Sequence, residues 1–192
     1  MSRQVTCHLP DAHHIFVRAA RLNDNNETVE SKFYPFYNAI FHYWFPTSEG
    51  YDIYPQWPIA EGSRRTVDFT ITFVIEHNMR PLMLVEIKPP SHFPVYSKRK
   101  AAIGQVHRRL NDVGPNNLHA DRLYAISAIG KRWRACYALR GRGSKGGLPV
   151  RGIAEKSSLR STSPECWNED ITSDASFEAL KRIVNTIKRY VA

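Results

Sequence analysis

Apolar and polar residues alternate in two neighbouring segments of this 192-residue chain, within the stretch from residue 64 to residue 90. Such alternation predicts two β-strands, and the polar and turn-forming residues at 77–81 between them predict a hairpin. Because successive side chains of a strand point to opposite faces, we expect Glu86 and Lys88 on one face. The other face receives the apolar odd-numbered positions, which are Val67, Phe69, Ile71, Phe73, Ile75, Met83, Val85 and Ile87.

Two carboxylates of this hairpin are expected to lie close together. A turn centred near His77 places Asp68 opposite Glu86, and a register shifted by two leaves them diagonal neighbours about 5–8 Å apart. Carboxylates at such a distance repel one another unless a cation lies between them. Mg²⁺ and Mn²⁺ are hard ions that prefer oxygen ligands, so the hairpin predicts a site for one of them.

The remaining pattern predicts an α/β fold in which helices flank a central mixed sheet of about four to five strands. Apolar residues at helical spacing predict helices over 27–45, 98–112 and 173–191, and Pro35 should bend or interrupt the first. Further strands are predicted at 51–59, where prolines favour a sheet edge or a bulge, and at 122–129 and 133–139 as a hairpin. We expect one domain over residues 1–192, with its core at about 28–140.

The predicted hairpin and the helix after it resemble the PD-(D/E)xK nuclease superfamily, which has the restriction-endonuclease-like fold. The residues that carry the resemblance are Asp68, Glu86 and Lys88, within a core of about residues 28–140. The resemblance implies that Asp68 and Glu86 bind the metal and that the carbonyl of Ile87 is a third ligand. It also implies that Lys88 orients the attacking water. Val67 stands where the family's name has a proline.

Two further residues match the family by their order in the chain. Glu30 opens the first predicted helix, where several branches of the family carry a glutamate that reaches the metal site. Gln105 lies on the helix after Lys88, where the family often carries a supporting glutamine or lysine. Each has an ordinary alternative: Glu30 as a carboxylate favoured by the helix dipole, and Gln105 as a solvent-facing residue. The alternative for the hairpin itself is a solvated strand face with a cross-strand ion pair.

Composition and charge narrow the class of protein. The chain is 42% hydrophobic, as expected of a folded protein, and its net charge of +9 favours a polyanionic partner, nucleic acid before membrane. Its three cysteines are widely spaced and form no CxxC pair, which argues against a disulfide framework or a structural zinc site and favours a reducing, intracellular compartment. Nucleus and cytoplasm are not distinguished. We expect neither a signal peptide nor a membrane-spanning segment.

Basic residues in three places are candidates for contact with phosphate groups. One pair precedes the hairpin, a second lies on the helix after it, and a third belongs to a glycine-rich basic segment at about 140–160. These residues are Arg64, Arg65, Arg108, Arg109, Arg142 and Lys145. Solvated surface cations, and a mobile surface loop at 140–160, are the alternatives.

Together these patterns predict a Mg²⁺-dependent phosphodiesterase of the endonuclease type, acting on DNA. A nuclease-like domain that has lost catalysis and only binds nucleic acid or protein is the main alternative. An unrelated α/β interaction domain, in which the same residues form an ion pair, is another. The sequence leaves open whether RNA is cut, where the cut falls, and whether the chain forms a homodimer.

Overall fold

The computed structural model describes residues 27–55, 72–77, 80–113, 121–139, 150–152 and 162–191. Its α-helices are α2 (Tyr34–Trp44), α3 (Tyr96–Val113) and α4 (Asp174–Val191), and its 3-10 turns include η1 (Glu30–Phe33), η2 (Thr47–Glu49), η3 (Pro90–His92) and η5 (Pro164–Cys166). The strands are β1 (Tyr51–Pro55), β2 (Thr72–His77), β3 (Arg80–Lys88), β4 (Arg122–Ile129), β5 (Arg132–Leu139), β6 (Val150–Gly152) and β7 (Glu169–Asp170).

All the described strands belong to one mixed sheet, in the order β1-β2-β3-β4-β5-β6, with β7 also paired to β5. β3 and β4 run parallel, whereas the other neighbours are antiparallel. The predicted α/β class with a mixed sheet is therefore confirmed. The described sheet has seven strands rather than four to five, because the short strands β6 and β7 both pair with β5.

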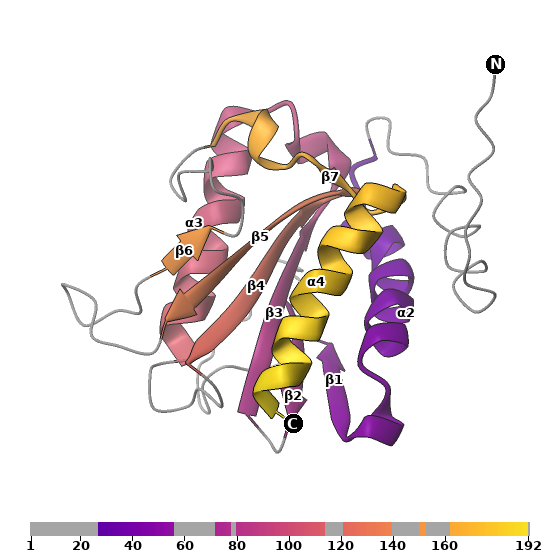
Figure 1. Ribbon diagram of the computed structural model, residues 1–192. Helices are drawn as coiled ribbons and strands as arrows, with labels where there is room; N and C mark the ends of the chain where they lie inside the picture. Colours follow the sequence, from indigo (N-terminus) through magenta and orange to yellow (C-terminus); the bar gives the residue numbers. More distant parts are fainter. Residues whose placement is uncertain are drawn as a thin grey trace.

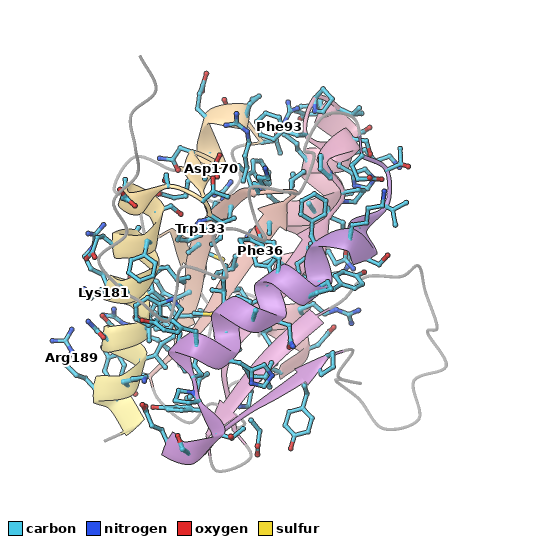
Figure 2. The ribbon with its side chains drawn as sticks, turned by 90° about the vertical axis from the view of Figure 1, so that its right-hand side faces the viewer. Phe36, Phe93, Trp133, Asp170, Lys181 and Arg189 are labelled. Carbon is cyan, nitrogen blue, oxygen red and sulfur yellow. The ribbon has the colours of Figure 1, made fainter. Side chains whose placement is uncertain are left out.

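Helices cover both faces of this sheet, with α2 and α4 on one side and α3 on the other (Figure 1). Viewed from the side, Phe36 and Trp133 lie in the interior, while Lys181 and Arg189 point outward from α4 (Figure 2). β3 is buried on both faces, as expected of a central strand. Its odd-numbered residues Met83, Val85 and Ile87 pack with α2 and α4, whereas Leu84 packs with α3.

Local sequence explains most of the element boundaries. The predicted first helix is interrupted where expected: η1 is a 3-10 turn, and α2 begins at Tyr34 with Pro35 in its first turn. Proline is tolerated there because the first helical N–H groups have no partner within the helix. Strand β4 has the predicted bounds, and β5 begins one residue earlier than predicted and pairs with it antiparallel. Among the described strands, β1 lies at one edge of the sheet, one of the two positions that the prolines at 51–59 favoured.

The predicted register of the hairpin is wrong. Thr72 lies opposite Glu86, four residues further along the chain than the expected partner Asp68. The turn was expected too early: His77 still belongs to β2 and pairs with Arg80. Asp68 itself lies outside the described residues.

A bulge contributes to this difference. The pairing of β2 with β3 shifts between Ile75 and Glu76, so that Ile75 faces Met83 while Glu76 faces Pro81. An extra residue in one strand changes which side chains are opposite each other. The alternation of apolar and polar residues along a single strand does not reveal such a bulge. Alternation therefore predicted the faces of β3 correctly but not its partner residues.

Candidate functional site

Glu86 and Lys88 lie near the carboxyl end of β3, on the face covered by α3. Their placement follows from the alternation of the strand, because Leu84, two residues before Glu86, packs with α3. Both are buried, with exposed fractions of 2% for Glu86 and 9% for Lys88. Charged side chains are seldom buried to this extent without a partner of opposite charge, so the surroundings of each determine what they can do.

The turn between β4 and β5 holds the end of β3 in place. The N–H of Gly130 donates to the carbonyl of Lys88 (2.8 Å), and the hydroxyl of Tyr37 on α2 donates to the carbonyl of Gly130 (2.8 Å). Gly130 has a φ of 61°, a left-handed conformation that glycine adopts without strain. The backbone of Lys88 is thus tied to a tight turn that is itself tied to a buried helix.

Lys88 forms an ion pair with Glu30, a residue far away in the sequence. Its Nζ lies 3.8 Å from Oε2 of Glu30, and the two side chains are 11% and 15% exposed. The other carboxylate oxygen of Glu30 accepts a hydrogen bond of 2.8 Å from the hydroxyl of Tyr34. Burial raises the pKa of Glu30 above its ordinary value, and the hydrogen bond from Tyr34 and the charge of Lys88 partly offset this rise.

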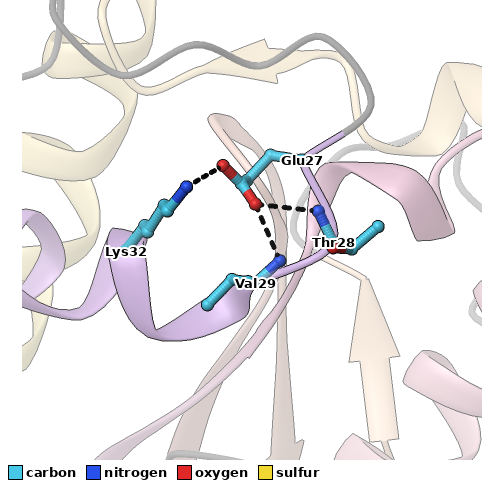
Figure 3. A network of polar contacts seen from close by, with 4 residues as sticks. All are labelled: Glu27, Thr28, Val29 and Lys32. Atoms are coloured by element: carbon cyan, nitrogen blue, oxygen red, sulfur yellow. Dashed lines mark hydrogen bonds and ion pairs between the residues drawn. The ribbon is translucent and has the colours of Figure 1, made fainter.

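Glu27 anchors the turn that carries Glu30. Its side chain accepts hydrogen bonds from the N–H groups of Thr28 and Val29 (3.0 Å each) and from the ammonium of Lys32 (Figure 3). The hydrogen bond with Lys32, followed by that from Val29, lowers the pKa of Glu27. The carbonyl of Glu27 accepts from the N–H of Ser91 (3.1 Å), which joins this segment to the loop directly after Lys88.

Glu86 is paired with a cation from α3. The Nε of Arg109 lies 3.3 Å from Oε1 of Glu86. Arg109 and Gln105 lie one helical turn apart and are both partly exposed, next to the buried stripe of α3 that contains Val106 and Leu110. This edge of α3 therefore faces the site, whereas Arg108 is exposed.

A row of buried polar residues crosses the sheet at the level of Glu86. Ser127 of β4 lies opposite Glu86, and Arg134 of β5 lies opposite Ser127. The exposed fractions of Ser127 and Arg134 are 4% and 7%, and the guanidinium of Arg134 lies 5.3 Å from the ring centre of Trp167. Sequence reasoning missed this row. The sequence did offer a signal for it: a single polar residue, Ser127 or Arg134, lies inside the apolar run of each strand.

His92 is a further residue that sequence reasoning missed. It ends η3, the turn that follows Lys88 and Pro89. Burial lowers the pKa of His92, and the positive charges of Lys98 and Lys88 lower it further. Its position one turn after the predicted Glu86-Ile87-Lys88 motif was the available signal. These effects favour the neutral imidazole, whose unprotonated ring nitrogen can accept a proton.

The structure brings together some of the predicted site residues. Near the carboxyl end of β3, Lys88 pairs with Glu30 from a distant segment, and Arg109 of α3 pairs with Glu86. Gln105 lies on α3 one turn before Arg109. The side chain of Ile87 packs on the opposite face, so its carbonyl is the group that it could offer to a metal. Asp68 and four of the predicted phosphate-contacting residues lie outside the described residues: Arg64, Arg65, Arg142 and Lys145.

The donor atoms at this site suit a hard cation only in part. Within the described ranges, no three His, Cys, Asp or Glu residues lie close enough together to hold a metal ion. Mg²⁺ usually keeps several waters and takes one or two carboxylates, so Glu86 and one further acid would suffice. Glu30 and Asp68 are the candidates for that further acid.

Comparison with family models, curated proteins and solved structures found no match to this chain. In the part of the chain that the structure describes, no helix is long and apolar enough to cross a membrane.

Proposed function

We propose that this chain is a metal-dependent nuclease that hydrolyses phosphodiester bonds in DNA, on a restriction-endonuclease-like core. The observation that carries the proposal is the convergence around Lys88. Its ammonium lies 3.8 Å from the carboxylate of Glu30, and Glu86 is buried two residues earlier on the same face of β3. Two acids and a lysine thus share one end of a central strand, next to the helix that carries Gln105.

The order of elements supports the proposed core. An N-terminal helix precedes three antiparallel strands, the motif ends the third of them, and a helix then leads to a strand parallel to β3. This order extends the helix, strand and strand arrangement that the resemblance implies. The net charge of +9 suits a phosphate-rich substrate. Fold alone does not establish an activity, so the proposal depends on the residues of the site.

Each residue of the site has a proposed role in hydrolysis. A water oxygen attacks phosphorus, the bond to the leaving oxygen breaks, and negative charge accumulates on the phosphoryl group. Lys88 offers only hydrogen-bond donors when it carries its proton, so we assign it the orientation of that water and the neutralisation of charge. Glu30 holds the ammonium of Lys88 in position. A divalent ion bound at Glu86 would lower the pKa of the attacking water and neutralise charge on the phosphate.

The second acid ligand distinguishes two versions of the proposal. Asp68 is the ligand that the resemblance implies, although the observed register places Thr72, not Asp68, opposite Glu86. Glu30 is the acid that the described structure places beside Lys88. Saturable Mn²⁺ binding should therefore be compared in Asp68→Asn and Glu30→Gln. Removing the charge of the acid that binds the metal should weaken this binding, whereas removing the charge of the other acid should not.

A cleavage assay tests the proposal. Supercoiled plasmid, duplex and single-stranded DNA, and RNA would be incubated with Mg²⁺ or Mn²⁺, with a chelator as the blank. Wild type should cleave DNA only with metal, and Glu86→Gln and Lys88→Ala should each reduce the rate by about 100-fold or more. Matched controls are Glu178→Gln and Lys181→Ala, which remove the same charges from the exposed pair on α4 and should leave the rate unchanged.

Two results would count against the proposal. Cleavage that persists unchanged in Glu86→Gln and Lys88→Ala would reject this site as the source of the activity. Saturable metal and DNA binding without any cleavage would instead support a nuclease-like domain that has lost catalysis.

A further inference from the structure

Arg109 contacts the buried carboxylate that the proposed function assigns to a metal. The Nε of Arg109 lies 3.3 Å from Oε1 of Glu86, whose side chain is 2% exposed. The Arg109 side chain is 36% exposed and reaches Glu86 from the solvent-accessible edge of α3. The positive charge of Arg109 thus lies beside Glu86, where a bound metal ion would place its own positive charge.

A guanidinium and a divalent ion compete for the same carboxylate. The buried Glu86 carboxylate is stabilised by a nearby cation, and Arg109 supplies one. A metal ion bound at Glu86 would in turn be repelled by a guanidinium that remained in hydrogen-bonding position. Metal binding at Glu86 therefore favours withdrawal of Arg109.

Arg109 has a second partner in reach. Its Nη1 lies 3.9 Å from Oδ2 of Asp112, three residues further along α3, and Asp112 is 52% exposed. The guanidinium could therefore move away from Glu86 by side-chain rotation and keep a carboxylate beside it, with no rearrangement of the helix. Exposed arginine side chains change rotamer on the picosecond to nanosecond scale, so the exchange needs no slow step.

We infer that Arg109 is a displaceable counter-ion of Glu86. It neutralises the carboxylate when no metal is bound, and it gives the carboxylate up to a divalent ion while pairing with Asp112. The inference rests on the proposed function, because it assigns the metal to Glu86. It changes the role of Arg109, which the sequence suggested as a contact for phosphate, to one in controlling metal affinity.

Removal of Arg109 should then strengthen metal binding. In Arg109→Gln, Mn²⁺ no longer competes with the guanidinium for Glu86. We therefore expect the dissociation constant for Mn²⁺ to fall by about tenfold in this variant. In Arg108→Gln it should fall by about twofold or less. Arg108→Gln is a close control, because it removes the same charge from the neighbouring, exposed position of α3. The comparison separates direct competition from a general change in net charge.

The experiment measures Mn²⁺ binding to the purified full chain by electron paramagnetic resonance, in wild type, Arg109→Gln, Arg108→Gln and Glu86→Gln. The melting temperature without metal should fall more in Arg109→Gln than in Arg108→Gln, and Mn²⁺ should reduce that difference. Equal affinities in wild type and Arg109→Gln, with binding abolished by Glu86→Gln, would overturn the inference and leave the proposed metal site standing. An absence of saturable binding in every form would overturn both.

A measurement on the wild-type chain covers the case in which Arg109→Gln does not fold. The Nε–H resonance of Arg109, assigned by its loss in Arg109→Lys, should move toward the position of a solvent-exposed arginine on saturation with Mg²⁺. A resonance that stays unchanged while Mg²⁺ saturates the chain would show that Arg109 keeps its contact with Glu86, and would overturn the inference.

Discussion

Lys88 and Glu30 should be coupled energetically, and a double-mutant cycle would measure the coupling. The cycle compares the free energies of unfolding of wild type, Lys88→Met, Glu30→Gln and the double variant. Methionine keeps much of the apolar stem of lysine, and glutamine keeps the shape of glutamate without its charge. The cycle cancels the separate effects of burial and leaves the interaction between the two side chains.

The expected size of the coupling follows from distance and burial. Two unit charges about 4 Å apart attract one another by about 1 kcal/mol in bulk water and by about 4 kcal/mol at an effective dielectric constant of about 20. The Nζ–Oε2 distance is 3.8 Å and the side chains are 11% and 15% exposed, which places the pair between these limits. We expect a coupling of about 2 kcal/mol at pH 7, larger than in exposed pairs.

The coupling should disappear in acid. Burial holds the pKa of Glu30 above its ordinary value of 4.5, so its carboxylate takes up a proton in the folded chain at a higher pH than an ordinary glutamate does. Because this pKa is raised on folding, the contribution of Glu30 to stability is largest in acid. It falls as the pH rises from the unfolded pKa through the folded one. Lys88→Met should deepen that fall, because the charge of Lys88 lowers the pKa of Glu30.

Urea unfolding at pH 7 and pH 4 would test these expectations. The exposed pair Lys181–Glu178 is a matched control, with a distance of 3.3 Å and exposed fractions of 43% and 55%. Its coupling should be about 0.5 kcal/mol or less. The reasoning would be refuted if the Lys88–Glu30 coupling at pH 7 did not exceed that of the control, or if it persisted undiminished at pH 4.

Three further predictions concern the core. Leu110→Ala should reduce the free energy of unfolding in urea by about 3 kcal/mol, because Leu110 is 0% exposed between α3 and the sheet; a loss below about 1 kcal/mol would contradict this packing. Ser176→Ala should cost about 1–3 kcal/mol, because the buried indole N–H of Trp133 donates to Oγ of Ser176 over 2.6 Å, and an unchanged stability would argue against that hydrogen bond. Burial raises the pKa of Cys136 to about 12, so iodoacetamide at pH 8 should modify Cys166 before Cys136, and Cys136 only in denaturant; peptide mapping that shows equal rates for these two would contradict this order.

Local pattern was enough to predict most elements and their buried faces. Strand β4 has the predicted bounds because its apolar run ends at Gly130, a turn residue with positive φ. The faces of β3 were correct because alternation is a property of a single strand. The interruption of the first helix was predicted because the ring of Pro35 restricts the backbone in any context.

Pairing between strands was not predictable in the same way. The position of a turn decides the register, and the chain offers several turn-forming residues between 77 and 81. The structure extends β2 to His77 and adds a bulge after Ile75, so that Thr72 rather than Asp68 lies opposite Glu86. Neither feature changes the alternation of either strand, which is why the sequence alone could not distinguish the registers.

The sequence by itself determined that Glu86 and Lys88 share a strand face and that other segments of the chain carry further acidic and basic residues. Only the tertiary structure decided which of these charges meet. From the sequence, Glu30 had two equal interpretations, and Arg109 was a candidate for phosphate contact or a solvated cation. In the structure, η1 places the carboxylate of Glu30 beside Lys88, and α3 places the guanidinium of Arg109 beside Glu86. The physical reason is that a strand or helix repeats by local geometry, whereas contacts between distant charges depend on how the elements pack against one another.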